Sequence, residues 1–143
     1  MKWPVLALLL GLGQGVALAD QAPATLPAQD RDAIQQVIQQ QMAAFRHDDG
    51  PAAFAFASPG IRAQFGNPDT FMDMVRRGYQ PVYRPRSTTF GALAEEDGQL
   101  IQHVQVVGPD GVNQEALYFM EHESDGSWRI SGCVLVKPAD VGA

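Results

Sequence analysis

The spacing of apolar residues changes once along the chain and predicts helices followed by strands. Between Asp30 and His47, apolar side chains recur at steps of three and four residues, which is typical of a helix with one apolar face. That face comprises Ile34, Val37, Ile38, Gln41, Met42 and Phe45. Beyond residue 87, apolar and polar residues alternate over short runs, which is typical of half-buried strands.

The segment between these two regions predicts short helices, each with its own start signal. A small polar residue before a proline is the pattern of a capped helix start, because proline suits the first helical turn. The pattern occurs at Asp49-Gly50-Pro51, Ser58-Pro59 and Asn67-Pro68. Gly66 and Gly78 are the expected ends of the last two short helices. Pro81 and Pro85 then predict an extended run over residues 80–86.

Four strands are predicted in the second half of the chain. Each of the three spacers between them contains Asp-Gly, a pair that tight hairpin turns favour. The strands are expected over residues 87–94, 99–107, 112–122 and 127–136. Helices first and a meander afterwards predict an α+β domain, in which one long helix and two or three short ones pack on a curved four-stranded antiparallel sheet.

Tight turns at the two later hairpins predict which face of the sheet meets the helices. They pair Val104 with Glu115, and Phe119 with Ile130. Since side chains alternate along a strand, the expected inner face comprises Leu100, Val104, Val106, Leu117, Phe119, Trp128, Ile130 and Val134. The expected outer face comprises Ile101, His103, Gln105, Ala116, Tyr118, Met120, Arg129, Ser131 and Cys133.

The only cysteine, Cys133, is a candidate nucleophile. The same register places it in one row with His103 and Ala116, about 10 Å from the histidine. A cysteine–histidine pair needs hydrogen-bond contact, and the predicted row holds no carboxylate or amide to orient His103. We therefore expect a structural thiol.

The first residues have the features of a secretory signal peptide. Lys2 precedes a short apolar run, and residues 17–19 (Ala-Leu-Ala) form the small-x-small site after which signal peptidase cuts. The run is shorter than the roughly 20 residues that span a membrane. We expect a signal peptide over residues 1–19, cleavage between Ala19 and Asp20, and a periplasmic or secreted protein. An uncleaved N-terminal anchor is the alternative.

The remaining chain is expected to form a flexible lead-in over residues 20–29, one domain over 30–137 and a tail over 138–143. The net charge of −6 argues against nucleic acid and against general attraction to anionic lipid. Because the chain has a single cysteine, it forms no intramolecular disulfide, and no cysteine follows the apolar run to carry a lipid anchor.

Three stretches of the chain resemble the bacterial domain-of-unknown-function family 4864. They are residues 57–68 (ASPGIRAQFGNP), 71–87 (FMDMVRRGYQPVYRPRS) and 125–133 (DGSWRISGC), and the similarity covers about residues 30 to 137. That family has no assigned chemistry, so the resemblance implies a class and a compartment rather than a mechanism. More loosely, the element order resembles the nuclear-transport-factor-2-like (cystatin-like) cone, which implies a sheet curved around the first helix and an apolar pocket between them.

The most distinctive candidate binding site lies between residues 76 and 86. It comprises four arginines and two tyrosines: Arg76, Arg77, Tyr79, Tyr83, Arg84 and Arg86. Guanidinium groups suit carboxylate and phosphate, and tyrosines give rigid contact area, so we expect an anionic ligand or an acidic protein surface to bind here. In the alternative interpretation the tyrosines pack in the core and the arginines pair within the chain, with Asp69, Asp73, Glu95 or Glu96.

Acid–base chemistry has a second candidate at the end of the long helix. His47 and Asp48 would form a dyad there if a pocket desolvated one of them, with Tyr79 or Tyr83 as a further partner. A helix end followed by a capped helix explains the same residues without chemistry.

Four phenylalanines are expected to line a pocket or to fill the core: Phe54, Phe56, Phe65 and Phe71. The three histidines share no ligand spacing, and no nucleotide or cofactor motif is present, so no metal and no cofactor are expected.

Together these features predict an exported domain that binds a small ligand or a protein partner without catalysis. The alternative is a small-pocket enzyme of the cone type, an isomerase, dehydratase or hydrolase. We expect no nucleic-acid partner and no stable membrane anchor after cleavage. A homodimer through the mixed outer face of the sheet is left open.

Overall fold

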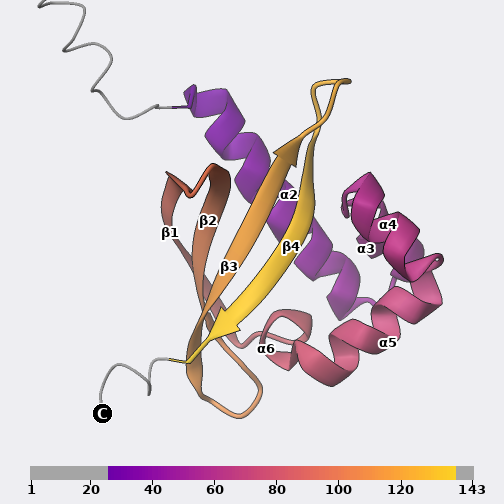
Figure 1. Ribbon diagram of the computed structural model, residues 1–143. Helices are drawn as coiled ribbons and strands as arrows, with labels where there is room; N and C mark the ends of the chain where they lie inside the picture. Colours follow the sequence, from indigo (N-terminus) through magenta and orange to yellow (C-terminus); the bar gives the residue numbers. More distant parts are fainter. Residues whose placement is uncertain (1–25, 138–143) are drawn as a thin grey trace, which may run out of the picture.

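The computed structural model describes residues 26–137 and confirms the predicted α+β fold (Figure 1). In this part of the chain, helices come first and an antiparallel sheet with strand order β1-β2-β3-β4 follows. The helices are α2 (Ala28–Arg46), α3 (Gly50–Ala55), α4 (Pro59–Phe65), α5 (Pro68–Gly78) and α6 (Gln80–Tyr83). The strands are β1 (Ser87–Glu96), β2 (Gln99–Val107), β3 (Asn113–His122) and β4 (Trp128–Val136). The predicted signal peptide, most of the lead-in and the C-terminal tail lie outside the described residues.

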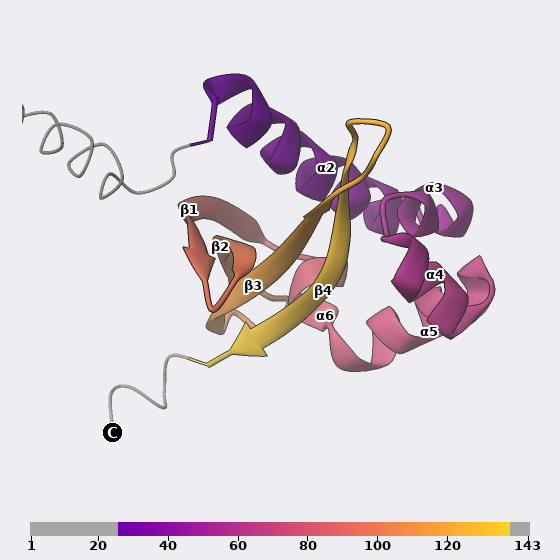
Figure 2. The ribbon, with the colours of Figure 1, turned by 45° about the horizontal axis from the view of Figure 1, so that its top comes forward.

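The long helix α2 crosses one face of the sheet, and the short helices curl beyond its far end (Figures 1 and 2). It begins at Ala28, two residues before the predicted start. Ile34, Ile38 and Met42 lie in its buried stripe and meet Val104, Val106 and other inner residues of the sheet in one core cluster. Each such fully buried side chain contributes about 1.5–3 kcal/mol of hydrophobic stabilisation, so the amphipathic stripe is what fixes α2 on the sheet.

The capped starts of the short helices are as predicted. Asp49, Ser58 and Asn67 each accept a hydrogen bond from the backbone N–H three residues ahead, and a proline follows each cap within two residues. Gly66 follows α4 with φ of 83°, a conformation that glycine adopts without strain. These local signals explain why the chain turns three times within about thirty residues.

The predicted extended run over residues 80–86 is wrong in its first half. Gln80–Tyr83 forms the short helix α6, with Pro81 in its first turn, where a missing N–H costs nothing. Val82 and Tyr83 are buried at 3% and 4% exposure, so packing selects the helical turn over the extended form. The strand β1 begins four residues after α6, at Ser87.

The strand register differs from the prediction by one residue. Val104 pairs with Ala116, not with Glu115, and Met120 pairs with Ile130. The reason is the turn length: Gly108 bonds Val112, and Glu123 bonds Ser127, so both hairpins have three-residue loops rather than two-residue turns. The glycine that ends each loop has a positive φ, 80° at Gly111 and 90° at Gly126, which is the usual geometry of such a loop.

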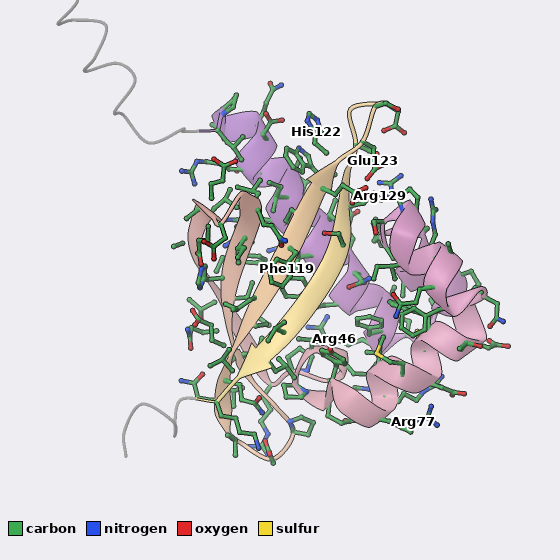
Figure 3. All side chains as sticks on the ribbon, viewed as in Figure 1. Arg46, Arg77, Phe119, His122, Glu123 and Arg129 are labelled. Atoms are coloured by element: carbon green, nitrogen blue, oxygen red, sulfur yellow. The ribbon has the colours of Figure 1, made fainter. Side chains whose placement is uncertain are left out.

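This shift reverses the predicted faces of β3. Ala116, Tyr118 and Met120 are the inner, buried residues of the strand, whereas Leu117 and Phe119 lie on the outer face (Figure 3 labels Phe119). The inner residues of β2 and the first half of β4 are as predicted, since Val104, Val106, Trp128 and Ile130 are all buried.

A β-bulge reverses the second half of β4 as well. The register shifts between Phe119 and Met120, so that Gly132 pairs with Phe119 and Cys133 pairs with Tyr118. The extra residue turns Cys133 toward the helices, where it packs against the core, and leaves Val134 outside with 45% of its surface exposed. The prediction that placed Cys133 outside and Val134 inside is therefore wrong.

None of the helices described over residues 26–137 combines the length and the apolar character that crossing a membrane requires.

Candidate ligand cavity between the short helices and the sheet

A cavity of about 370 Å³ lies where α2, α4 and α5 meet the inner face of β3 and β4. Its volume falls within the range of small-molecule sites. The helical side supplies Gln41, Phe45, Ala57, Ile61, Gln64, Phe65, Phe71, Met74, Val75, Tyr79 and Val82. The sheet supplies Tyr118, Ile130, Gly132 and Cys133. None of these lining residues is Asp, Glu, Lys, Arg or His, so the cavity carries no formal charge.

Aromatic rings form one wall of the cavity. Phe71 is at the centre of this wall, with ring centroids 5.7 Å from Phe65, 6.2 Å from Phe45 and 5.4 Å from Phe54. Of the four phenylalanines expected from the sequence, Phe65 and Phe71 line the cavity and Phe54 supports them from behind. Phe56 has another role, because its carbonyl oxygen accepts a hydrogen bond from the backbone N–H of Ile130.

Tyr118 contributes the most unusual polar group of the lining. The residue is 1% exposed, and its hydroxyl has no hydrogen-bond partner among the described residues. Burial raises the pKa of this hydroxyl well above its usual value of 10.0, so the phenol stays neutral. A buried polar group without a partner is rare in folded proteins and calls for an explanation.

Cys133 lies beside Tyr118 and is neutral for the same reason. Burial raises the pKa of its thiol from 9.0 to about 12, while the neighbouring Tyr118 hydroxyl acts in the opposite direction. Part of the side chain surface remains open to the cavity. A neutral thiol at physiological pH is a poor nucleophile. The structural role expected from the sequence was argued from the outer-face placement of Cys133, which is wrong, and that role stays a prediction.

Gln41 is a second polar residue of the lining, 4% exposed. Its Nε2 donates to the backbone oxygen of Ala53 at 3.1 Å, which fixes the orientation of the amide and ties α2 to α3. Its Oε1 accepts no hydrogen bond from any described residue. The glutamine thus stands in the apolar stripe of α2 with its acceptor unused.

Tyr79 has a satisfied hydroxyl, in contrast to Tyr118. The Tyr79 hydroxyl donates to the backbone oxygen of Cys133 at 3.1 Å. This bond holds the segment after α5 against β4. Burial raises the pKa of Tyr79 above its usual value of 10.0.

Residues 76–86 hold the four arginines and two tyrosines singled out in the sequence and are called the arginine–tyrosine segment. Apart from Tyr79, these six residues lie outside the cavity lining, and most of them bond to the chain itself. Tyr83 is buried, donates to the carboxylate of Asp48 and accepts from Nε of Arg76 at 3.1 Å. Arg84 lies 4.2 Å from the centroid of the Tyr83 ring and also binds Asp48, at 3.0 Å. This network joins the segment to the end of α2.

The three remaining arginines differ in their surroundings. Arg76 pairs with Asp73 at 3.0 Å, as one alternative predicted, while Arg86 donates to the backbone oxygen of Pro109 at 2.7 Å. Arg77 is exposed and has no ion pair among the described residues; Figure 3 shows it on the outer side of α5. That these residues bind a ligand or partner stays a prediction.

His47 and Asp48 do not line the cavity. The Asp48 carboxylate has a lowered pKa because Tyr83 and Arg84 hydrogen-bond to it, and this favours the ionised form. His47 is exposed, and its Nδ1 lies 2.8 Å from the backbone oxygen of Ala43. The two side chains therefore have structural partners at the end of α2.

His103 lies on the outer face between two carboxylates. Its Nε2 is 2.7 Å from Glu96 and its Nδ1 is 2.9 Å from Glu115, both through Oε2. Hydrogen bonds to these carboxylates raise the pKa of His103 above 6.5. The prediction that no carboxylate orients His103 is wrong. It was based on the predicted register, which differs by one residue from the register in the structure. Residues 26–137 hold no group of three or more His, Cys, Asp or Glu arranged for a metal ion.

The sequence interpretation missed Tyr118 and Cys133 as cavity residues, because both had been assigned to the outer face. For Gln41 a signal was available: an amide within an otherwise apolar helical stripe either has a buried partner or faces a polar ligand.

Comparison with known proteins identifies the family of the chain. Neither curated proteins nor solved structures gave a significant match to the chain. The family model for the domain of unknown function DUF4864 matches residues 27–143, which include every helix and strand described above and all residues of the cavity. The chain therefore belongs to the DUF4864 family.

Proposed function

We propose that this protein is an exported binding domain that holds a small, uncharged and mainly apolar molecule in the cavity between its short helices and its sheet. The observation that carries this proposal is the lining itself: about 370 Å³ of space bordered by apolar, aromatic and neutral polar side chains, with no charged residue. A charged ligand would lose its hydration in such a cavity without gaining an ion pair, whereas an apolar ligand loses nothing.

Access to the cavity supports the same proposal. Ile61, Phe65 and Met74 line it and are only partly buried, so α4 and α5 leave an opening to solvent. Phe45, Val75 and Ile130 form the deeper lining and are almost fully buried. An apolar molecule can therefore enter between the short helices and bury most of its surface.

A neutral fluorescent probe tests the proposal directly. N-phenyl-1-naphthylamine, whose emission rises in apolar surroundings, is expected to bind the protein with one-to-one stoichiometry. Ile61→Trp is expected to block binding, because the larger ring fills the cavity from its half-buried edge. Val112→Trp is the matched control, since Val112 is 43% exposed in the loop after β2 and does not line the cavity.

Two outcomes would contradict binding in the cavity: no saturable fluorescence change in the unmodified protein, or equal binding in both tryptophan variants. The export part of the proposal has a separate test. N-terminal mass analysis of protein recovered from the periplasm or medium of an expressing bacterium should find a chain that starts at Asp20. A chain retained in the cytoplasm with Met1 intact would contradict export and leave the binding proposal standing.

A further inference from the structure

The polar groups of the cavity restrict the chemistry of the ligand. The lining contains two polar side chains with unused hydrogen-bonding capacity: Tyr118, whose hydroxyl is fully enclosed, and Gln41, whose Oε1 is not fully enclosed. An enclosed polar group without a partner, such as the Tyr118 hydroxyl, costs desolvation free energy without compensation, and native structures hold few of them. A bound molecule is the natural source of the missing partners.

The two side chains require different things of that molecule. The Nε2 of Gln41 is committed to the backbone oxygen of Ala53, so only the acceptor Oε1 is left. It needs a ligand that donates a hydrogen bond. The Tyr118 hydroxyl can donate or accept; the neighbouring Cys133 thiol is only a weak partner for it, and no hydrogen bond of normal geometry joins the hydroxyl to a described residue.

Neither group carries a charge that a ligand could use. The phenol of Tyr118 and the thiol of Cys133 beside it both stay protonated at neutral pH. Arg76, Arg84 and Arg86 contact Asp73, Asp48 and the backbone of Pro109, respectively, and no arginine lines the cavity. A carboxylate ligand would therefore meet no cation inside.

We infer that the ligand is an uncharged, mainly apolar compound carrying a hydroxyl group, which donates to Gln41 Oε1 or exchanges a hydrogen bond with Tyr118. A hydroxyl is the smallest neutral group that suits both side chains, since it donates and accepts. This inference rests on the proposed function, because it names the ligand class of the same cavity.

A matched series of aromatic probes tests the inference. The series comprises naphthalene as hydrocarbon, 2-naphthol as hydroxyl compound and 2-naphthoate as anion, each titrated against the full chain after signal removal. We expect 2-naphthol to bind about five- to tenfold more tightly than naphthalene, the effect of one neutral hydrogen bond. We expect 2-naphthoate to bind more weakly than 2-naphthol.

Three variants locate the origin of the preference. Tyr118→Phe and Gln41→Met each remove one unused polar atom with little change in volume, and Gln41→Met also removes the bond from Nε2 to the Ala53 backbone oxygen. Tyr79→Phe is the matched control, because it removes a phenol hydroxyl from the same lining that is already bonded to the backbone of Cys133. The ratio of the two dissociation constants is compared within each variant, so a general loss of stability cancels.

Loss of the preference in Tyr118→Phe or in Gln41→Met, with the preference kept in Tyr79→Phe, supports the inference and identifies the contact. Equal binding of naphthalene and 2-naphthol to the unmodified protein overturns it and leaves the proposed function intact. Retention of the full preference in both variants, or its loss in Tyr79→Phe alone, also overturns it. Failure of all three probes to bind overturns the proposed function and the inference together.

Discussion

Cys133 lies directly opposite Tyr118 across the β3–β4 ladder, and both side chains project toward the helices. The pair places a thiol and a phenol, both neutral, at the sheet side of an uncharged cavity. Two measurements test this arrangement: the reaction rate of the Cys133 thiol and the free energy of unfolding of Tyr118→Phe.

Cys133 is expected to react slowly with thiol reagents in the folded protein. Since burial raises the thiol pKa from 9.0 to about 12, the thiolate fraction near pH 8 falls by about a thousandfold. A time course with Ellman's reagent should therefore be about two to three orders of magnitude slower for native than for urea-unfolded protein. Added 2-naphthol should slow it further, because Cys133 lines the cavity. Equal native and unfolded rates would show that the thiol is freely exposed.

Tyr118→Phe and Tyr79→Phe are expected to change the free energy of unfolding differently. The Tyr118 hydroxyl has no partner, so its removal should leave stability unchanged or raise it. The Tyr79 hydroxyl donates to the backbone of Cys133, so its loss should cost about 1 kcal/mol. Urea unfolding in the absence of ligand measures both. A clear loss of stability in Tyr118→Phe would mean that its hydroxyl is already satisfied in the ligand-free protein.

The local features of the fold follow from the sequence, whereas its long-range register does not. Caps at Ser58 and Asn67 depend on residues within one turn, and those predictions are confirmed. Asp-Gly fits two-residue hairpins and three-residue loops alike, and β1–β2 has the former while the other hairpins have the latter. Because side chains alternate with period two, the single extra loop residue moved Tyr118 from the expected outer face to the cavity.

The candidate site was predictable only in part for the same reason. The position of Cys133 depends on a bulge near Gly132, which the sequence marks only by a glycine within a strand. The arginine–tyrosine segment stood out in the sequence because of its charge density, yet the structure shows most of its members bonded within the chain. Composition identifies unusual residues but not the partners that the fold supplies.

The pH dependence of stability should reveal the carboxylates around His103. Hydrogen bonds to Glu96 and Glu115 raise the folded-state pKa of His103 above its unfolded value of 6.5. The stabilisation is therefore complete below pH 6.5, while the carboxylates remain ionised, and is lost as pH rises through the folded-state pKa. The difference in unfolding free energy between the unmodified protein and His103→Gln should be larger at about pH 5.5 than at about pH 8.5.

His122→Gln is the control for that measurement. His122 stacks on Trp128 with ring centroids 4.2 Å apart and hydrogen-bonds the backbone of Gly126, and no ion pair joins it to any residue between 26 and 137. A His103→Gln difference that stays constant between the two pH values would indicate that the two carboxylates do not influence His103.

Within the arginine–tyrosine segment, Tyr83→Phe should lower stability and leave probe binding unchanged. It removes the hydroxyl that joins Asp48 to Arg76, at an expected cost of about 1 kcal/mol. Because Tyr83 does not line the cavity, the affinity for N-phenyl-1-naphthylamine should stay the same. Arg77→Ala, which removes an exposed side chain of the same segment, should change neither quantity. Weaker probe binding in Arg77→Ala would instead support a ligand contact by this segment.

The two edge strands of the sheet, β1 and β4, have a consequence for assembly. At Ile130 the backbone N–H and oxygen both bond the chain between α3 and α4, through Phe56 and Ser58. On the opposite edge the ladder of β1 is interrupted between Phe90 and Leu93, where the amide of Gln102 bonds the carbonyls of Gly91 and Ala92. A strand from a neighbouring molecule could not form a continuous ladder with β4, because the backbone of Ile130 is already bonded. It would meet an irregular backbone at β1. Both features disfavour edge-to-edge aggregation of the sheets.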